Sequence, residues 1–186
     1  MQKIFLAVSL SLGLMVNAQS TEEASSSSNS ERKNDIMLDP ISLISVSAIN
    51  INYERLLNEN SGVGLHAFAY LGDGYDDEDD DVFSQFSPYY RMYFGKKYAS
   101  GFFVEGFGLL SDGQYTPQDE NGNKLDTKKD YSAFGAGIGI GEKWTSNSGL
   151  FLEASAGLGR NFSIPEDAST TLILIGKVGI SVGYRF

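Results

Sequence analysis

The chain has 186 residues, with 14 Lys and Arg against 24 Asp and Glu, a net charge of −10 and no cysteine. This length suits one domain, and the acidic balance argues against nucleic acid as a partner. Without cysteine there is no disulfide, so an exported protein of this kind must be held together by its hydrogen-bonded framework.

The first 18 residues have the features of a signal peptide. Lys3 supplies a positive charge, residues 4–16 form an apolar run, and small residues precede a cleavage site that we expect after Ala18. A helix that stays in the bilayer needs about 20 apolar residues, so this run is short for one, although a retained signal anchor is the alternative. Residues 19–34 are serine-rich and charged, which is typical of a disordered tail, here expected in the periplasm.

Residues 35–186 consist of runs in which apolar and polar residues alternate, separated by turn-forming residues. The first run has the weakest pattern, because Pro40 cannot donate a ladder hydrogen bond and suits a bulge or an irregular edge. The sequence predicts an all-β fold, an eight-stranded antiparallel up-and-down transmembrane β-barrel. The expected strands are residues 35–43, 44–57, 62–72, 82–94, 101–111, 130–144, 149–162 and 171–186.

The connections between these strands alternate in length. Bacterial outer-membrane barrels have short periplasmic turns and longer outer loops. This rule places the acidic loops outside the cell and both termini in the periplasm. The short connections are 58–61, 95–100 and 145–148, and the long ones are 73–81, 112–129 and 163–169.

The final strand, residues 171–186, has the clearest pattern, because every second residue counted back from Phe186 is apolar or glycine. Strands of soluble proteins are usually about 5–6 residues long. A strand of this length with an aromatic end is more typical of a membrane-spanning barrel.

One face of each strand is almost purely apolar, and the other face carries the charges. A charge that faces lipid costs about 2–4 kcal/mol, so the mixed face should line the lumen. Three acids and four bases then point inward, close to the balance that a self-paired interior requires. This expected lumen charge network is Glu54, Arg91, Glu105, Lys143, Glu153, Lys177 and Arg185.

Inward glycines of the run 130–144 should leave room for Phe103, Phe107 and Phe151 of the neighbouring strands. Because an eight-stranded barrel is only wide enough to be filled by side chains, we expect a plugged lumen. Outward aromatic residues near the proposed periplasmic ends should form an interfacial girdle. They are Tyr53, Tyr90, Phe94, Trp144, Tyr184 and Phe186.

The segments 52–57, 88–95, 101–108 and 178–186 (NYERLL, PYYRMYFG, GFFVEGFG and VGISVGYRF) resemble a Bacteroidota-type family of uncharacterised small outer-membrane barrels of the OmpA/OmpX-like architecture. The resemblance covers about residues 35–186. It implies a location in the outer membrane of a Gram-negative bacterium, contact with outer-membrane lipid, and insertion by the barrel-assembly machinery, which would read Tyr184 and Phe186. It implies no cofactor and brings no catalytic residues.

Two features are candidates for chemistry. His66, the single histidine, could serve a lipid-modifying enzyme, but no serine and carboxylate partners are evident from spacing, which favours an interior histidine. Asp77, Asp79 and Asp81 lie in an acidic loop that could bind Ca²⁺ through carboxylate oxygens, or could simply be solvated.

These patterns predict a non-enzymatic outer-membrane barrel, monomeric, with a structural or surface-interaction role in the cell envelope. The alternatives are a lipid-modifying barrel enzyme, a narrow porin-like channel and a secreted soluble β-barrel.

Overall fold

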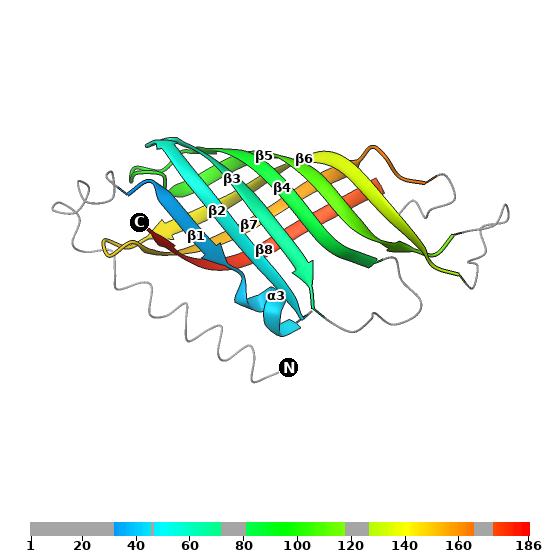
Figure 1. The fold of residues 1–186 in the computed structure, drawn as a ribbon. Helices are drawn as coiled ribbons and strands as arrows, with labels where there is room; N and C mark the ends of the chain where they lie inside the picture. The colour runs from blue at the N-terminus through cyan, green and yellow to red at the C-terminus, as the bar shows by residue number, and fades with distance from the viewer. Residues whose placement is uncertain (1–31, 46, 72–80, 118–126, 166–172) are drawn as a thin grey trace, which may run out of the picture.

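A computed structural model describes residues 32–45, 47–71, 81–117, 127–165 and 173–186 of the chain. Eight antiparallel strands form a closed barrel, in which each strand pairs with the next and β1 pairs with β8 (Figure 1). The all-β, up-and-down barrel expected from the alternation is therefore confirmed. The strands are β1 (Asn34–Leu38), β2 (Ala48–Asn58), β3 (Ser61–Tyr70), β4 (Asp81–Tyr93), β5 (Gly101–Tyr115), β6 (Lys129–Thr145), β7 (Leu150–Asn161) and β8 (Leu174–Arg185).

The three short connections lie at the same end of the barrel as the C-terminus, on the left of Figure 1. They join β2 to β3, β4 to β5 and β6 to β7. The other ends of these strands, Tyr70, Asp81, Tyr115, Lys129, Asn161 and Leu174, lie at the opposite end. We call the end with the short connections the turn end.

The prediction of a strand over residues 35–43 was wrong in its second half. β1 stops at Leu38, and Pro40–Ser45 form the short helix α3, so β2 begins at Ala48 instead of at residue 44. Asp39 caps this helix, because its Oδ1 accepts hydrogen bonds from the backbone N–H of Ile41 at 2.9 Å and of Ser42 at 3.2 Å. Proline is favoured at the first helical position, where its missing N–H is not needed. Two other strand boundaries differ from the prediction. β5 ends at Tyr115 instead of at residue 111, and β8 begins at Leu174 instead of at residue 171.

The alternation places apolar side chains on the outside of the barrel and charged or aromatic side chains inside. In β6, Ile138 is 74% exposed, whereas Lys143 is 0% exposed. The outer surface is therefore largely apolar, and the core of this protein is the barrel interior. No helix in the described part of the chain is long and apolar enough to cross a membrane.

Candidate functional site

The interior of the barrel at the turn end contains a network of ion pairs, and Arg91 on β4 is one of its two centres. Its guanidinium is buried and donates to Glu153 Oε2 at 2.8 Å, to Glu105 Oε2 at 2.7 Å and to Glu54 Oε2 at 3.2 Å. The guanidinium carbon also lies 3.8 Å from the centre of the Phe103 ring. Carboxylates from three other strands thus converge on one cation.

Lys143 on β6 is the second centre. Its Nζ lies 2.7 Å from Glu54 Oε2, 3.1 Å from Asp35 Oδ2 and 3.4 Å from Glu153 Oε2. It also donates a 2.6 Å hydrogen bond to Tyr93 Oη, and this hydroxyl in turn donates to Glu54 at 2.7 Å. Glu54 is therefore shared by both cationic centres.

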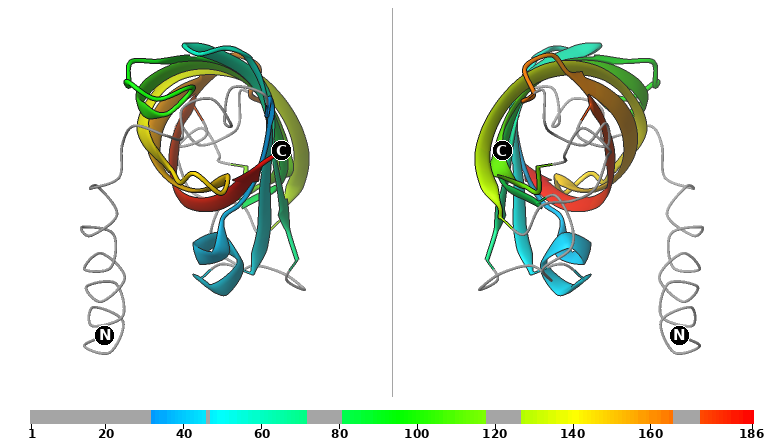
Figure 2. Two further views of the ribbon diagram at one scale, coloured as in Figure 1. Left: turned by 90° about the vertical axis from the view of Figure 1, so that its left-hand side faces the viewer. Right: turned by 90° about the vertical axis from the view of Figure 1, so that its right-hand side faces the viewer.

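Arg185 ties the network to the closure of the barrel. It forms a bidentate pair with Asp35 on β1, with distances of 2.8 and 2.9 Å from Nε and Nη2. Its guanidinium also donates to the backbone carbonyls of Tyr98 and Ala99 at 2.7 and 2.8 Å. The pair joins the first strand to the last one and holds the β4–β5 turn across the turn end, which faces the viewer on the left of Figure 2.

The structure brings all seven charges of the expected lumen network together. Lys177, the one farthest from the turn end, donates to Glu105 Oε1 at 3.0 Å. The sequence analysis missed Asp35, which is fully buried. Two signals pointed to it: the predicted set had one base in excess, and Asp35 alternates with the outward residues Ile36 and Leu38.

With Asp35 included, seven of the eight strands contribute a charge, and the exception is β3. Replacing a whole buried ion pair by apolar residues can be neutral, but removing one partner leaves an uncompensated buried charge and costs about 3–5 kcal/mol. The network therefore links seven strands across the interior, and each of its carboxylates is engaged by a cation.

Aromatic rings fill the remaining interior and lie directly over glycines. A Cβ added at Gly141 would overlap the Phe103 ring, and one added at Gly137 would overlap Phe107. A Cβ added at Gly183 would likewise overlap Phe151. Phe103 and Phe107 therefore pack against glycines of β6 as expected, whereas Phe151 lies over a glycine of β8 instead.

We expect Gly141→Ala to lower the free energy of unfolding by about 1–3 kcal/mol, because the methyl group would displace the buried Phe103 ring. Gly106→Ala is the matched control, since a Cβ there would have no atom within 4 Å. Chemical denaturation followed by Trp144 fluorescence measures both. Equal stabilities of the two variants would contradict this packing.

A polar pocket lies farther along the interior, beyond Arg91. Its cavity volume is only about 20 Å³, about the space that one water molecule needs. Its polar lining includes Asn50 and Asn52 of β2, His66 of β3, Ser155 of β7, and Lys177 and Ser181 of β8. His66 is 5% exposed, and its Nδ1 has no hydrogen-bond partner in the described part of the structure. A catalytic histidine needs a nucleophile and a carboxylate within hydrogen-bond reach. Nδ1 of His66 bonds neither kind of group among the described residues.

The remaining candidates lie elsewhere. Tyr184 and Phe186 are exposed at the turn end, on the outside of the last strand. Asp77 and Asp79 fall outside the described residues, as do residues 1–31, which include the expected signal peptide. Asp81 is the first residue of β4. Within the described ranges, no cluster of three or more His, Asp or Glu side chains could hold a metal ion.

Comparison of the chain with protein-family models, with curated proteins and with solved structures gave no match.

Proposed function

We propose that this chain is an integral outer-membrane β-barrel with a plugged lumen, which acts as a structural or surface-interaction protein of the cell envelope and not as an enzyme. The single observation that carries the proposal is the opposition between an apolar outer surface and an ion-paired interior. A soluble barrel would have a mainly polar outer surface, because large contiguous apolar patches are rare on soluble monomers. Lipid is the solvent that suits this surface.

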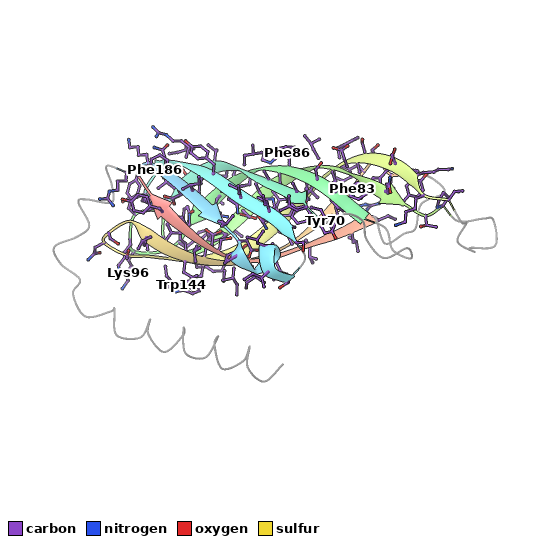
Figure 3. The ribbon with its side chains drawn as sticks, turned by 60° about the horizontal axis from the view of Figure 1, so that its bottom comes forward. Tyr70, Phe83, Phe86, Lys96, Trp144 and Phe186 are labelled. Atoms are coloured by element: carbon purple, nitrogen blue, oxygen red, sulfur yellow. The ribbon has the colours of Figure 1, made fainter. Side chains whose placement is uncertain are left out.

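Aromatic residues at both ends of the barrel support the same proposal. At the turn end, Trp144 and Phe186 are exposed (Figure 3), together with Tyr53, Tyr90, Phe94 and Tyr184. Toward the other end, Phe83 is exposed (Figure 3), and Phe134 packs edge-to-face on Phe162 at 6.0 Å. Two aromatic bands that flank an apolar zone are the interfacial girdles of membrane barrels.

The charge network argues against the channel alternative. Arg91 and Lys143 link carboxylates from opposite sides of the interior, and Arg185 holds Tyr98 and Ala99 over the turn end. An ion would have to break several buried pairs to pass. We therefore expect no steady conductance in planar bilayers.

Fractionation of cells that produce the chain tests the proposal. The protein should sediment with the outer membrane, resist alkaline carbonate extraction, and migrate faster on cold gels when it has not been boiled. Recovery of a folded protein in the soluble periplasmic fraction would contradict the proposal and would favour the secreted soluble barrel.

A further inference from the structure

The barrel wall is incomplete beside the first half of β8. β1 pairs with β8 only from Val182 to Arg185, and within the described chain the residues of β8 from Leu174 to Ser181 pair with β7 alone. This half of β8 lies away from the turn end (Figure 1). One edge of β8 therefore has no neighbouring strand there, and we call it the open edge.

The free hydrogen-bonding groups of the open edge belong to particular residues. Phe186 exchanges backbone hydrogen bonds of 2.8 and 3.0 Å with Asn34 of β1, whereas Arg185 N donates to Gly149 O on the side of β7. In an antiparallel sheet, successive residues turn their N–H and C=O to opposite edges. Because the ladder between β7 and β8 has no bulge, this alternation continues along the strand. The residues that turn both backbone groups to the open edge are Leu174, Gly176, Val178 and Ile180.

The sequence explains why β1 does not cover this edge. The register of the two strands would place Pro40 opposite Ile180, where a residue of β1 would have to donate a hydrogen bond to the Ile180 carbonyl. Proline has no N–H, and the chain leaves the sheet at Pro40 to form α3, which lies outside the ring of strands (Figure 2). No backbone hydrogen bond within the described residues joins α3 to β8.

The chemistry of the open edge selects its partner. Acyl chains neither donate nor accept hydrogen bonds, so lipid cannot satisfy these backbone groups. A second copy of the chain does not fit either. Barrel strands are tilted by about 35–45°, so the β8 strands of two copies related by a twofold axis along the membrane normal would cross instead of lying side by side. An extended peptide segment supplies both N–H and C=O groups at the spacing of the edge.

The neighbouring side chains define which segment fits. The residues at the open edge face outward and are apolar or glycine, and Val178 is 81% exposed. On the inner side, the adjacent cavity of about 20 Å³ leaves room only for small side chains. The buried Asp39 carboxylate has no ion pair among the described residues, and its Oδ2 would lie 3.2 Å from a Cβ at Gly179. Inward residues of an added strand should therefore be small and not acidic.

We propose that the open edge of β8 binds an extended peptide segment of a partner protein, which continues the barrel wall as an added strand antiparallel to β8. The segment has outward apolar residues that alternate with small inward residues. Directly opposite residues of an antiparallel pair share a face, so the outward residues of the segment form the hydrogen bonds with Gly176 and Val178. This inference deepens the proposed surface-interaction role and rests on it.

The test uses the folded barrel in nanodiscs and a fluorescent synthetic peptide, Lys-Val-Ser-Val-Ser-Val-Lys, with both ends blocked. Fluorescence anisotropy should show saturable binding at one peptide per barrel. N-methylation of the valines removes the N–H groups that face β8 and should abolish binding. N-methylation of the serines removes N–H groups on the far edge of the peptide and should leave binding unchanged.

A pair of variants tests the same ladder from the side of the barrel. Gly176→Pro removes an N–H that the ladder with β7 does not use, so the barrel should still fold, as shown by faster gel migration of unboiled samples. Peptide binding should weaken about five-fold or more, the loss expected for one backbone hydrogen bond. Gly176→Ala is the matched control, because it keeps the N–H and its Cβ would meet no atom within 4 Å.

Nuclear magnetic resonance locates the bound peptide. The amide protons of Gly176 and Val178 should shift on binding, whereas those of Ile175 and Lys177, which face β7, should shift little. Absence of saturable binding, equal binding of the two N-methylated peptides, or a barrel dimer that excludes the peptide would each overturn the proposal. A barrel that enters nanodiscs but binds no peptide contradicts this inference alone, whereas a folded barrel that stays out of nanodiscs contradicts the proposed membrane function.

Discussion

Replacing Arg91 with methionine is expected to lower the free energy of unfolding by about 3–5 kcal/mol, the largest loss that we expect from a single substitution in the barrel interior. The change removes the cation that Glu54, Glu105 and Glu153 share, while the carboxylates stay buried. Each carboxylate keeps one cationic partner, because Lys143 still reaches Glu54 and Glu153, and Lys177 still reaches Glu105. Guanidinium denaturation in detergent, followed by the fluorescence of Trp144, measures the loss.

Two comparisons make this prediction specific. Arg160→Met, at an exposed arginine of β7, should change the free energy of unfolding by no more than about 0.5 kcal/mol. Adding Glu153→Gln to Arg91→Met should recover part of the loss, because one buried negative charge disappears. If Arg91→Met and Arg160→Met were equally stable, the ionic interior would not hold the barrel together.

Replacing Asp35 with alanine is expected to have the second largest effect, again about 3–5 kcal/mol. Arg185 would lose its bidentate partner, and Lys143 would lose one of its carboxylates. Because Asp35 and Arg185 join β1 to β8, the loss should be concentrated at the closure of the barrel. Hydrogen exchange should show the amides of Asn34 and Phe186, which bond each other's carbonyls, exchanging faster than those of β5 and β6.

Asp130→Ala is the matched control for this prediction. Asp130 is exposed and accepts one hydrogen bond from Gln114 at 2.9 Å, so its loss should cost little. Uniformly faster exchange over all strands of Asp35→Ala, with no excess at β1 and β8, would show that Asp35 does not secure the closure.

The strands and their faces could be predicted from the sequence, because alternation is a local property that each strand carries by itself. Glu54, Arg91 and Lys143 were assigned to the interior in this way. Their pairing could not be predicted, because it depends on the register and on distances across the barrel. Lys143, for example, meets Glu54, 89 residues earlier in the chain.

The prediction failed where a local capping interaction competed with strand pairing. Asp39 and Pro40 favour the start of a helix, and α3 replaces the expected end of the first strand. An irregularity of the strand was expected at Pro40, but the helix that begins there was not. The part of β8 from Leu174 to Ser181 is left without a β1 partner because β1 is shorter than β8. The pattern of a single strand does not contain that information.

The central claim, that the apolar outer surface faces lipid, can be tested most directly by site-directed spin labelling. The chain has no cysteine, so Ile138→Cys introduces a unique labelling site on the outer face of β6. In lipid vesicles, a nitroxide at this position should be relaxed strongly by oxygen and weakly by a water-soluble nickel complex. A label introduced by Lys96→Cys at the exposed turn should show the opposite. Strong relaxation by nickel at position 138 in the folded barrel would contradict the account.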